Sequence, residues 1–256
     1  MIINKIVNSH IFKFFPRLIQ TKLLSNIVYF EKTNIKKLPV KNYDQQENLK
    51  VIFNKQINFK KKKLLKLSYT FPKLPKIIKK FYPKEKFNFL DYGGGEIKNF
   101  LYLILFFKKL NYFYKDKKYL ENFFKKQKVL RKFNQFNLFG KKHDYEIIHF
   151  GSSFQYIENI NLTLNSIISK KTKIIIISGI IIFEGIPNDK FICIQRNIQD
   201  KKFYQYFFNK KYLLNIFFNY DFKLKKIFHN KTDKYMNFKN FKKGNFKYID
   251  LIFLKS

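Results

Sequence analysis

The stretch that decides the fold is Phe87-Asn-Phe-Leu-Asp-Tyr-Gly-Gly-Gly-Glu96, in which a short apolar run leads directly into three glycines. The whole chain has only 8 glycines in 256 residues, so three in succession are a strong local signal. Glycine permits positive φ angles and lets a ligand approach the backbone, and the N–H groups that open a helix can face that ligand. We therefore predict a buried strand over 87–92, a ligand-binding turn at Gly93–Gly95 and a helix over 96–110. A tight turn without a ligand is the alternative.

Short apolar runs alternate with longer amphipathic segments through the rest of the chain. The further strands that we expect are 112–115, 133–139, 145–150, 173–177 and 191–195, and the further helices are 117–132, 160–169 and a stretch near 210–218. Strands at 224–229 and 248–254 could pair as an antiparallel edge hairpin. Because strands that alternate with helices favour a parallel sheet covered on both faces, the predicted fold class is α/β. We expect a doubly wound, mostly parallel Rossmann-like sheet in residues 87–256.

Residues 1–86 differ from the rest, since they carry 21 basic and 4 acidic residues and no glycine. Apolar residues recur at roughly helical spacing between Ile6 and Ile27, interrupted by Pro16, and a second basic stretch lies at 60–66. We predict a lysine-rich helical extension that ends in an irregular linker. It could be a solvated cap over the core, or it could contact an anionic membrane surface or a nucleic acid.

The composition excludes several classes of protein. With 46% hydrophobic residues the chain can build a core, so it is not disordered. The single cysteine, Cys193, excludes a disulfide framework and a cysteine-based zinc site, and it fits a reducing compartment. No apolar run approaches the roughly 20 residues of a membrane span, and no His/Asp/Glu cluster has metal-ligand spacing. We expect a soluble, cytoplasmic protein without a transmembrane segment or a metal.

Asp91-Tyr-Gly93-Gly94-Gly95, at the end of the first predicted strand, resembles the cofactor loop of class I S-adenosylmethionine (SAM)-dependent methyltransferases. The resemblance implies that the methionine part of SAM packs against the backbone of these glycines, and it assigns Asp91 to cofactor binding together with Gly93, Gly94 and Gly95. It also implies that an acidic residue at the end of the second strand accepts hydrogen bonds from the ribose, and Asp116 occupies that place. An ordinary helix N-cap is the alternative role for Asp116.

A second motif, Ser152-Ser153-Phe-Gln155-Tyr-Ile157, follows the strand predicted at 145–150. Together with Leu-Asp-Tyr-Gly-Gly-Gly at 90–95, it is similar to one methyltransferase family of bacterial surface-polysaccharide gene clusters, over residues 87–229. The resemblance implies methyl transfer to a sugar hydroxyl or a similar small acceptor. It assigns Ser152, Ser153 and Gln155 to contacts with the cofactor or acceptor, and turn capping is their alternative role.

The chain departs from this family at two places, Ile97 and the run Ile177-Ser-Gly-Ile180, where the family usually has a basic residue and a proline. Ile97 stands where the family usually has a glycine, and we expect its branched side chain to crowd the loop or tilt the helix. A hydroxyl acceptor would need a general base, for which Glu184 and His149 are weak candidates and His143 a weaker one. A mid-strand His149 can equally be a core histidine whose ring nitrogens are both hydrogen-bonded.

The formal net charge of +36 is the basis of two alternative functions. One is a nucleic-acid-binding protein or an RNA methyltransferase, because lysines interleaved with aromatic rings can bind phosphates and stack bases. The charge is spread over both parts of the chain, however, and arginine, the commoner reader of bases, is nearly absent. The other alternative is a catalytically degenerate scaffold that lies on anionic lipid through residues 1–86.

Overall fold

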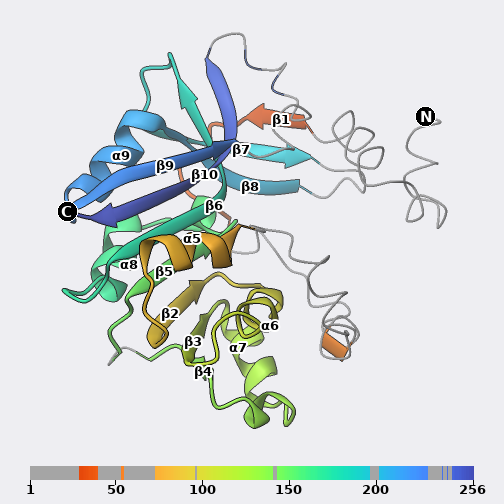
Figure 1. Cartoon of the computed structure of the whole chain (residues 1–256). Coiled ribbons are helices and arrows are strands. Elements are labelled where there is room, and N and C mark those ends of the chain that lie inside the picture. The colour runs from red at the N-terminus through yellow and green to blue at the C-terminus, as the bar shows by residue number, and fades with distance from the viewer. Residues whose placement is uncertain are drawn as a thin grey trace, which may run out of the picture. The chain divides into compact units, whose positions relative to one another are not determined.

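The computed structural model describes residues 29–39, 53–54, 73–95, 97–140, 143–196, 202–229, 238, 241 and 244–256. The helix predicted between Ile6 and Ile27 and the basic stretch at 60–66 lie outside these residues. The chain divides into two compact units (Figure 1). Unit 1 comprises Met1–Asp44, Ile180–Ile216 and Phe228–Asp250, and unit 2 comprises Gln45–Gly179, Phe217–Ile227 and Leu251–Ser256.

Unit 2 is built on a parallel sheet with the strand order β4-β3-β2-β5-β6. Its strands are β2 (Phe87–Tyr92), β3 (Leu110–Lys115), β4 (Phe136–Leu138), β5 (Ile147–Gly151) and the first part of β6 (Ile174–Glu184). Every neighbouring pair in this order is parallel. The chain runs outward from β2 to β4 and then returns to continue with β5 on the other side of β2. The order therefore reverses between β2 and β5, as in doubly wound α/β folds.

Helices connect these strands, which confirms the predicted α/β class. The connections carry α6 (Lys98–Leu103), α7 (Lys118–Lys125) and α8 (Ile160–Ile167), with 3-10 turns η2 (Leu130–Lys132) and η3 (Phe154–Tyr156), and α5 (Leu74–Phe81) precedes β2. α8 begins where the side chain of Asn159 accepts a hydrogen bond from the Leu162 N–H at 3.0 Å. α6 is shorter than predicted, because Leu110 is already in β3, fully buried and paired with Phe87.

Two further strands extend the sheet. β10 (Asn245–Lys255) pairs with both β6 and β9 (Phe222–His229). The predicted pairing of the last two strands at an edge of the sheet is therefore confirmed, with β9 as the outer strand and β10 as the inner one. Its residues 249–253 are buried, as expected of an interior strand. In the described part of the chain β9 pairs only with β10, and its exposed lysines are typical of a sheet edge.

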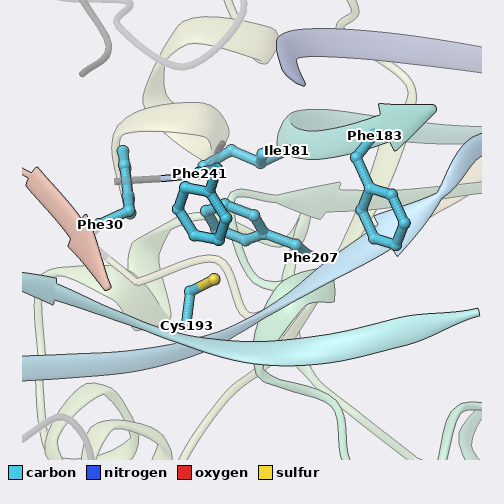
Figure 2. Packing of buried hydrophobic residues seen from close by; sticks show 6 residues of the cluster. All are labelled: Phe30, Ile181, Phe183, Cys193, Phe207 and Phe241. Atoms are coloured by element: carbon cyan, nitrogen blue, oxygen red, sulfur yellow. The ribbon is translucent and has the colours of Figure 1, made fainter. Parts of the chain in front are cut away.

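Unit 1 contains an antiparallel hairpin of β7 (Lys190–Arg196) and β8 (Lys202–Asn209), followed directly by α9 (Lys210–Phe218). β1 (Tyr29–Lys32) pairs antiparallel with β7, and β8 pairs parallel with the last part of β6. The cluster drawn in Figure 2 lies in this unit: Phe30, Ile181, Phe183, Cys193, Phe207 and Phe241. Tyr29–Lys32, just beyond the helical pattern read over 6–27, thus form a strand, and Phe30 buries its ring in this cluster.

Candidate functional site

The candidate site lies at the carboxyl edge of the parallel sheet in unit 2. The glycine loop (Gly93–Gly95) follows β2, Asp116 follows β3, and the serine loop (Ser152–Gln155) follows β5. Because β2 and β5 are neighbours at the point where the strand order reverses, the first and third of these segments meet there. In doubly wound sheets, ligands bind in the crevice at such a switch point.

Each glycine of the loop has a different neighbour. A Cβ on Gly93 would lie 2.1 Å from the Cβ of Ser153, and a Cβ on Gly94 would lie 2.7 Å from Asp91 Oδ2. Gly95 has φ +58°, and a Cβ built there would have no described heavy atom within 4 Å other than those of Gly95 and its chain neighbours. Packing therefore requires glycine at positions 93 and 94. A tight turn without a ligand would require the same. Packing does not require a glycine at position 95. The open space beside Gly95 allows a ligand to approach the backbone.

Asp116 holds the glycine loop against the end of β3. Its Oδ2 accepts the Gly95 N–H at 2.7 Å, its Oδ1 accepts the Lys117 N–H at 2.7 Å, and the Tyr114 hydroxyl donates to the Gly95 carbonyl at 2.6 Å. Burial raises the pKa of Asp116, while the hydrogen bonds from the Lys117 and Gly95 amides oppose the shift. The N-cap of α7 is Lys117, not Asp116, so the capping role considered for Asp116 is not seen.

The serine loop packs directly on the glycine loop. Ser153 Oγ donates to the Tyr92 carbonyl at 2.6 Å, and Ser152, at φ 55°, donates its N–H to the Ser178 carbonyl at 2.7 Å. Gln155 is 6% exposed, and its Oε1 has no hydrogen-bond partner in the described part of the chain. An amide oxygen that stays buried and unpaired costs about 1–3 kcal/mol, so a bound donor at this position would be stabilising.

Asp91 lies beneath the glycine loop and is fully buried. Its Oδ1 is 2.8 Å from His149 Nδ1, and its Oδ2 accepts hydrogen bonds from Asn99 Nδ2 at 3.0 Å and from the Tyr112 hydroxyl. Burial, and next the charge of Asp91, raise the pKa of Tyr112 well above its ordinary value, so this hydroxyl stays protonated and donates. The Asp91 carboxylate therefore contacts three protein side chains.

His149 is fully buried between two strands. Its Nδ1 faces Asp91, and its Nε2 lies 2.7 Å from Ser178 Oγ on β6. Both ring nitrogens thus have protein partners, which matches the core-histidine interpretation. A base must be within reach of the proton that it removes, and neither nitrogen of His149 faces solvent.

Glu184, the other candidate base, belongs to unit 1 and not to the unit that carries the glycine loop. Lys210 Nζ lies 2.8 Å from its carboxylate, and this hydrogen bond lowers the pKa of Glu184. A lowered pKa makes a carboxylate a weaker base at neutral pH. The exposed His143 packs its ring 4.6 Å from that of Phe113.

Ile97 is fully buried at the N-cap of α6, with an ordinary φ of −72°. None of its atoms lies within 4 Å of a Cβ built on Gly95. The side chain therefore packs in the core and leaves the open space beside the loop unfilled.

Sequence reasoning missed the side chains that surround Asp91 and Asp116. Tyr112 and Tyr114 are two residues apart in β3 and therefore lie on the same face of the strand. This spacing could have been recognised in the sequence. No sequence pattern predicted the contacts of Asn99 and Ser178. The pairing of β5 with β6 brings Ser178 near His149.

The described residues contain neither a metal-binding group nor a membrane-spanning helix. No group of three or more His, Cys, Asp or Glu side chains in this part of the chain could hold a metal ion. Among the same residues, no helix is long and apolar enough to cross a membrane.

No protein-family model matches the chain, and no curated protein sequence matches it. Solved structures with a similar fold include the 1,6-didemethyltoxoflavin-N1-methyltransferase of Burkholderia thailandensis (9% identity, 89% of this chain and 95% of that chain, TM-score 0.49). Others are a SAM-dependent methyltransferase from Clostridium acetobutylicum (10%, 76% and 95%, 0.47) and the sugar N-methyltransferase KedS8 from a Streptoalloteichus species (9%, 88% and 99%, 0.44). The fold assignment rests on the strand order rather than on these similarities.

Proposed function

We propose that this chain is a SAM-dependent methyltransferase whose cofactor binds over the glycine loop, on its open side at Gly95, and beside the serine loop. The observation that carries the proposal is Gln155 Oε1, in the loop that follows β5 at the switch point of the sheet, which is buried and has no hydrogen-bond partner among the described residues. A ligand that donates a hydrogen bond there would remove the cost of the unpaired oxygen.

The chemistry of the surrounding residues fits this cofactor. The backbone at Gly95 is open to a close approach, as the methionine part of SAM would require. Asp116 is half-buried, and its Oδ1 accepts one described hydrogen bond, so it retains an acceptor position for a ribose hydroxyl. We assign cofactor contacts to Gly93, Gly94, Gly95, Asp116, Ser152, Ser153 and Gln155. Asp91 supports the loop from below.

A bound SAM would supply an activated methyl group: the acceptor's nucleophilic atom would bond to the methyl carbon as the carbon–sulfur bond breaks in line, and S-adenosylhomocysteine would leave. The residues of this chain contribute binding, orientation and exclusion of water. We propose a sugar hydroxyl or a similar small acceptor in surface-polysaccharide metabolism, on the resemblance of the motifs at 90–95 and 152–157. We assign no general base, because His149 has partners on both nitrogens and the pKa of Glu184 is lowered.

Calorimetric titration with SAM and S-adenosylhomocysteine (SAH) tests the cofactor proposal, and Gln155→Leu sharpens the test. This substitution keeps the volume but removes the acceptor, so SAH affinity falls about tenfold or more for a lost hydrogen bond. Stability is retained, because an unpaired buried oxygen is also removed. Gln205→Leu is the matched control, since Gln205 is a buried glutamine of unit 1 that bonds Gln195 at 3.0 Å.

Folded wild-type protein that binds neither SAM nor SAH at high micromolar concentration would contradict the proposal. If Gln155→Leu binds SAH as tightly as wild type does, Gln155 does not contact the cofactor. Transfer assays with neutral sugars and amino sugars then test the acceptor. If the protein methylates no sugar of either class, the proposal of a sugar acceptor is wrong.

A further inference from the structure

Four buried side chains form one continuous chain of hydrogen bonds beneath the two loops. They are Tyr112 on β3, Asp91 on β2, His149 on β5 and Ser178 on β6. All four are fully buried, and they come from four adjacent strands of the parallel sheet. The proposed function assigns no step to this chain of hydrogen bonds.

The partners set the direction of these hydrogen bonds. Asp91 is surrounded by the donors Tyr112 and Asn99 on Oδ2, which leaves Oδ1 to accept from His149 Nδ1. A histidine that donates from Nδ1 in its neutral form accepts at Nε2, so the Ser178 hydroxyl donates to it at 2.7 Å. The other acceptor near this hydroxyl, the Phe150 carbonyl, is 3.5 Å away. Every hydrogen bond in the chain therefore points toward Asp91.

The order Ser178–His149–Asp91, with distances of 2.7 Å and 2.8 Å, is that of a Ser-His-Asp triad in hydrolases. Ser178 is fully buried within β6, however, so a substrate cannot reach its hydroxyl. The arrangement therefore orients groups and performs no nucleophilic step.

The part of this chain that runs from Asp91 through His149 to Ser178 supports one of the two loops at each of its ends. A Cβ on Gly94 would lie 2.7 Å from Asp91 Oδ2, so Asp91 is the surface on which the glycine loop rests. At the other end, the Ser178 carbonyl accepts the N–H of Ser152, whose φ of 55° is uncommon for a residue other than glycine. His149 is the group that joins the two ends.

We propose that His149 is a positioning residue that holds the glycine loop and the serine loop in one relative geometry through Asp91 and Ser178. Its effect on SAH affinity rests on the proposed function, whereas its effect on the loops does not. His149→Asn can replace the donor at Nδ1, and His149→Gln can replace only the group at Nε2. We therefore expect the asparagine variant to preserve the glycine loop better than the glutamine variant does.

The first experiment measures amide hydrogen exchange in the full chain without ligand. We expect the amides of the glycine loop and of Ser152 to exchange about tenfold faster in His149→Gln than in wild type, and about as slowly as wild type in His149→Asn. Thr172→Val is the matched control, because Thr172 is fully buried in unit 2 and its Oγ1 accepts the Ser169 N–H at 3.0 Å away from the loops. If exchange at the loops rises equally in all three variants, His149 is merely structural and the proposal is overturned.

The second experiment reads the ring nitrogens of His149 by proton–nitrogen correlation NMR, with assignment from His149→Phe. Wild type should carry its proton on Nδ1. Asp91→Asn presents an amide N–H to Nδ1, so the proton should move to Nε2 and the direction of the chain should reverse. A ring protonated on Nε2 in wild type overturns the proposed direction, as does an unchanged tautomer in Asp91→Asn.

SAH titration completes the set. We expect affinity to fall about tenfold or more in His149→Gln and to stay within about threefold of wild type in His149→Asn and Thr172→Val. If wild type binds no SAH, the proposed function fails while the exchange and NMR results still decide the role of His149. If His149→Gln does not fold, Ser178→Ala replaces it, since it leaves Nε2 without its donor. Labelling of Ser178 by a fluorophosphonate would overturn the assignment of a purely positioning role.

Discussion

Replacing Gly94 with alanine tests whether the glycine loop rests directly on Asp91. The new Cβ would lie 2.7 Å from Asp91 Oδ2 and 3.0 Å from Tyr114 Cε2, and both of these side chains are fully buried and hydrogen-bonded. Neither can turn away, so the loop itself must move. Overpacking of this kind lowers the free energy of unfolding by about 1–3 kcal/mol. The lower conformational entropy of the unfolded alanine variant raises it by about 0.4–1 kcal/mol. We expect a net loss of about 0.5–2 kcal/mol in the free energy of unfolding.

The assay is urea unfolding, in which a changed midpoint at constant slope reports stability, together with SAH titration. Because the loop must move, Gly94→Ala should also weaken SAH binding by about tenfold. Gly140→Ala is the control, since a Cβ there would lie 3.1 Å from the exposed His143, which can move aside. If Gly94→Ala matches Gly140→Ala in both stability and affinity, the loop does not rest on Asp91 as described.

Two further predictions concern Asp116 and the cluster in unit 1. Burial raises the folded-state pKa of Asp116 above its unfolded value of about 3.9, so its contribution to stability is greatest below that pH and is lost as the pH rises through the folded pKa. Asp116→Asn should remove this loss, and urea unfolding from acidic to neutral pH measures it; parallel curves for both proteins would contradict the pKa shift. Phe207 is fully buried against Phe30 and Phe241, so Phe207→Ala should cost about 3–5 kcal/mol by thermal unfolding. A loss below about 1 kcal/mol would show that the cluster is loosely packed.

Elements with a strong local pattern were predicted well. The apolar run at 87–92, the helix near 210–218 and the strand at 191–195 all lie where we expected them. β6 was predicted to end at Ile177, because Ser178 and Gly179 interrupt the isoleucines. In the structure it continues to Glu184, with Gly179 at φ 70° inside the strand.

Elements that depend on distant partners were not predicted. Tyr29–Lys32 form a strand because β7, more than 150 residues later in the sequence, pairs with them. The strand at Lys202–Asn209 carries no alternation of polar and apolar residues, and it is defined by its pairing with β7 and β6.

For the candidate site, the sequence by itself determined that three glycines follow a buried strand and that an acidic residue and a serine-rich turn follow two others. These are local properties, because residue type and the end of an apolar run are both read along the chain. Only the tertiary structure decided what Asp91 and His149 contact. Side chains alternate between the faces of a strand, so the register of β2, β5 and β6 places Asp91, His149 and Ser178 in one buried chain of hydrogen bonds. That register is set by pairing between strands far apart in sequence, which no local pattern contains.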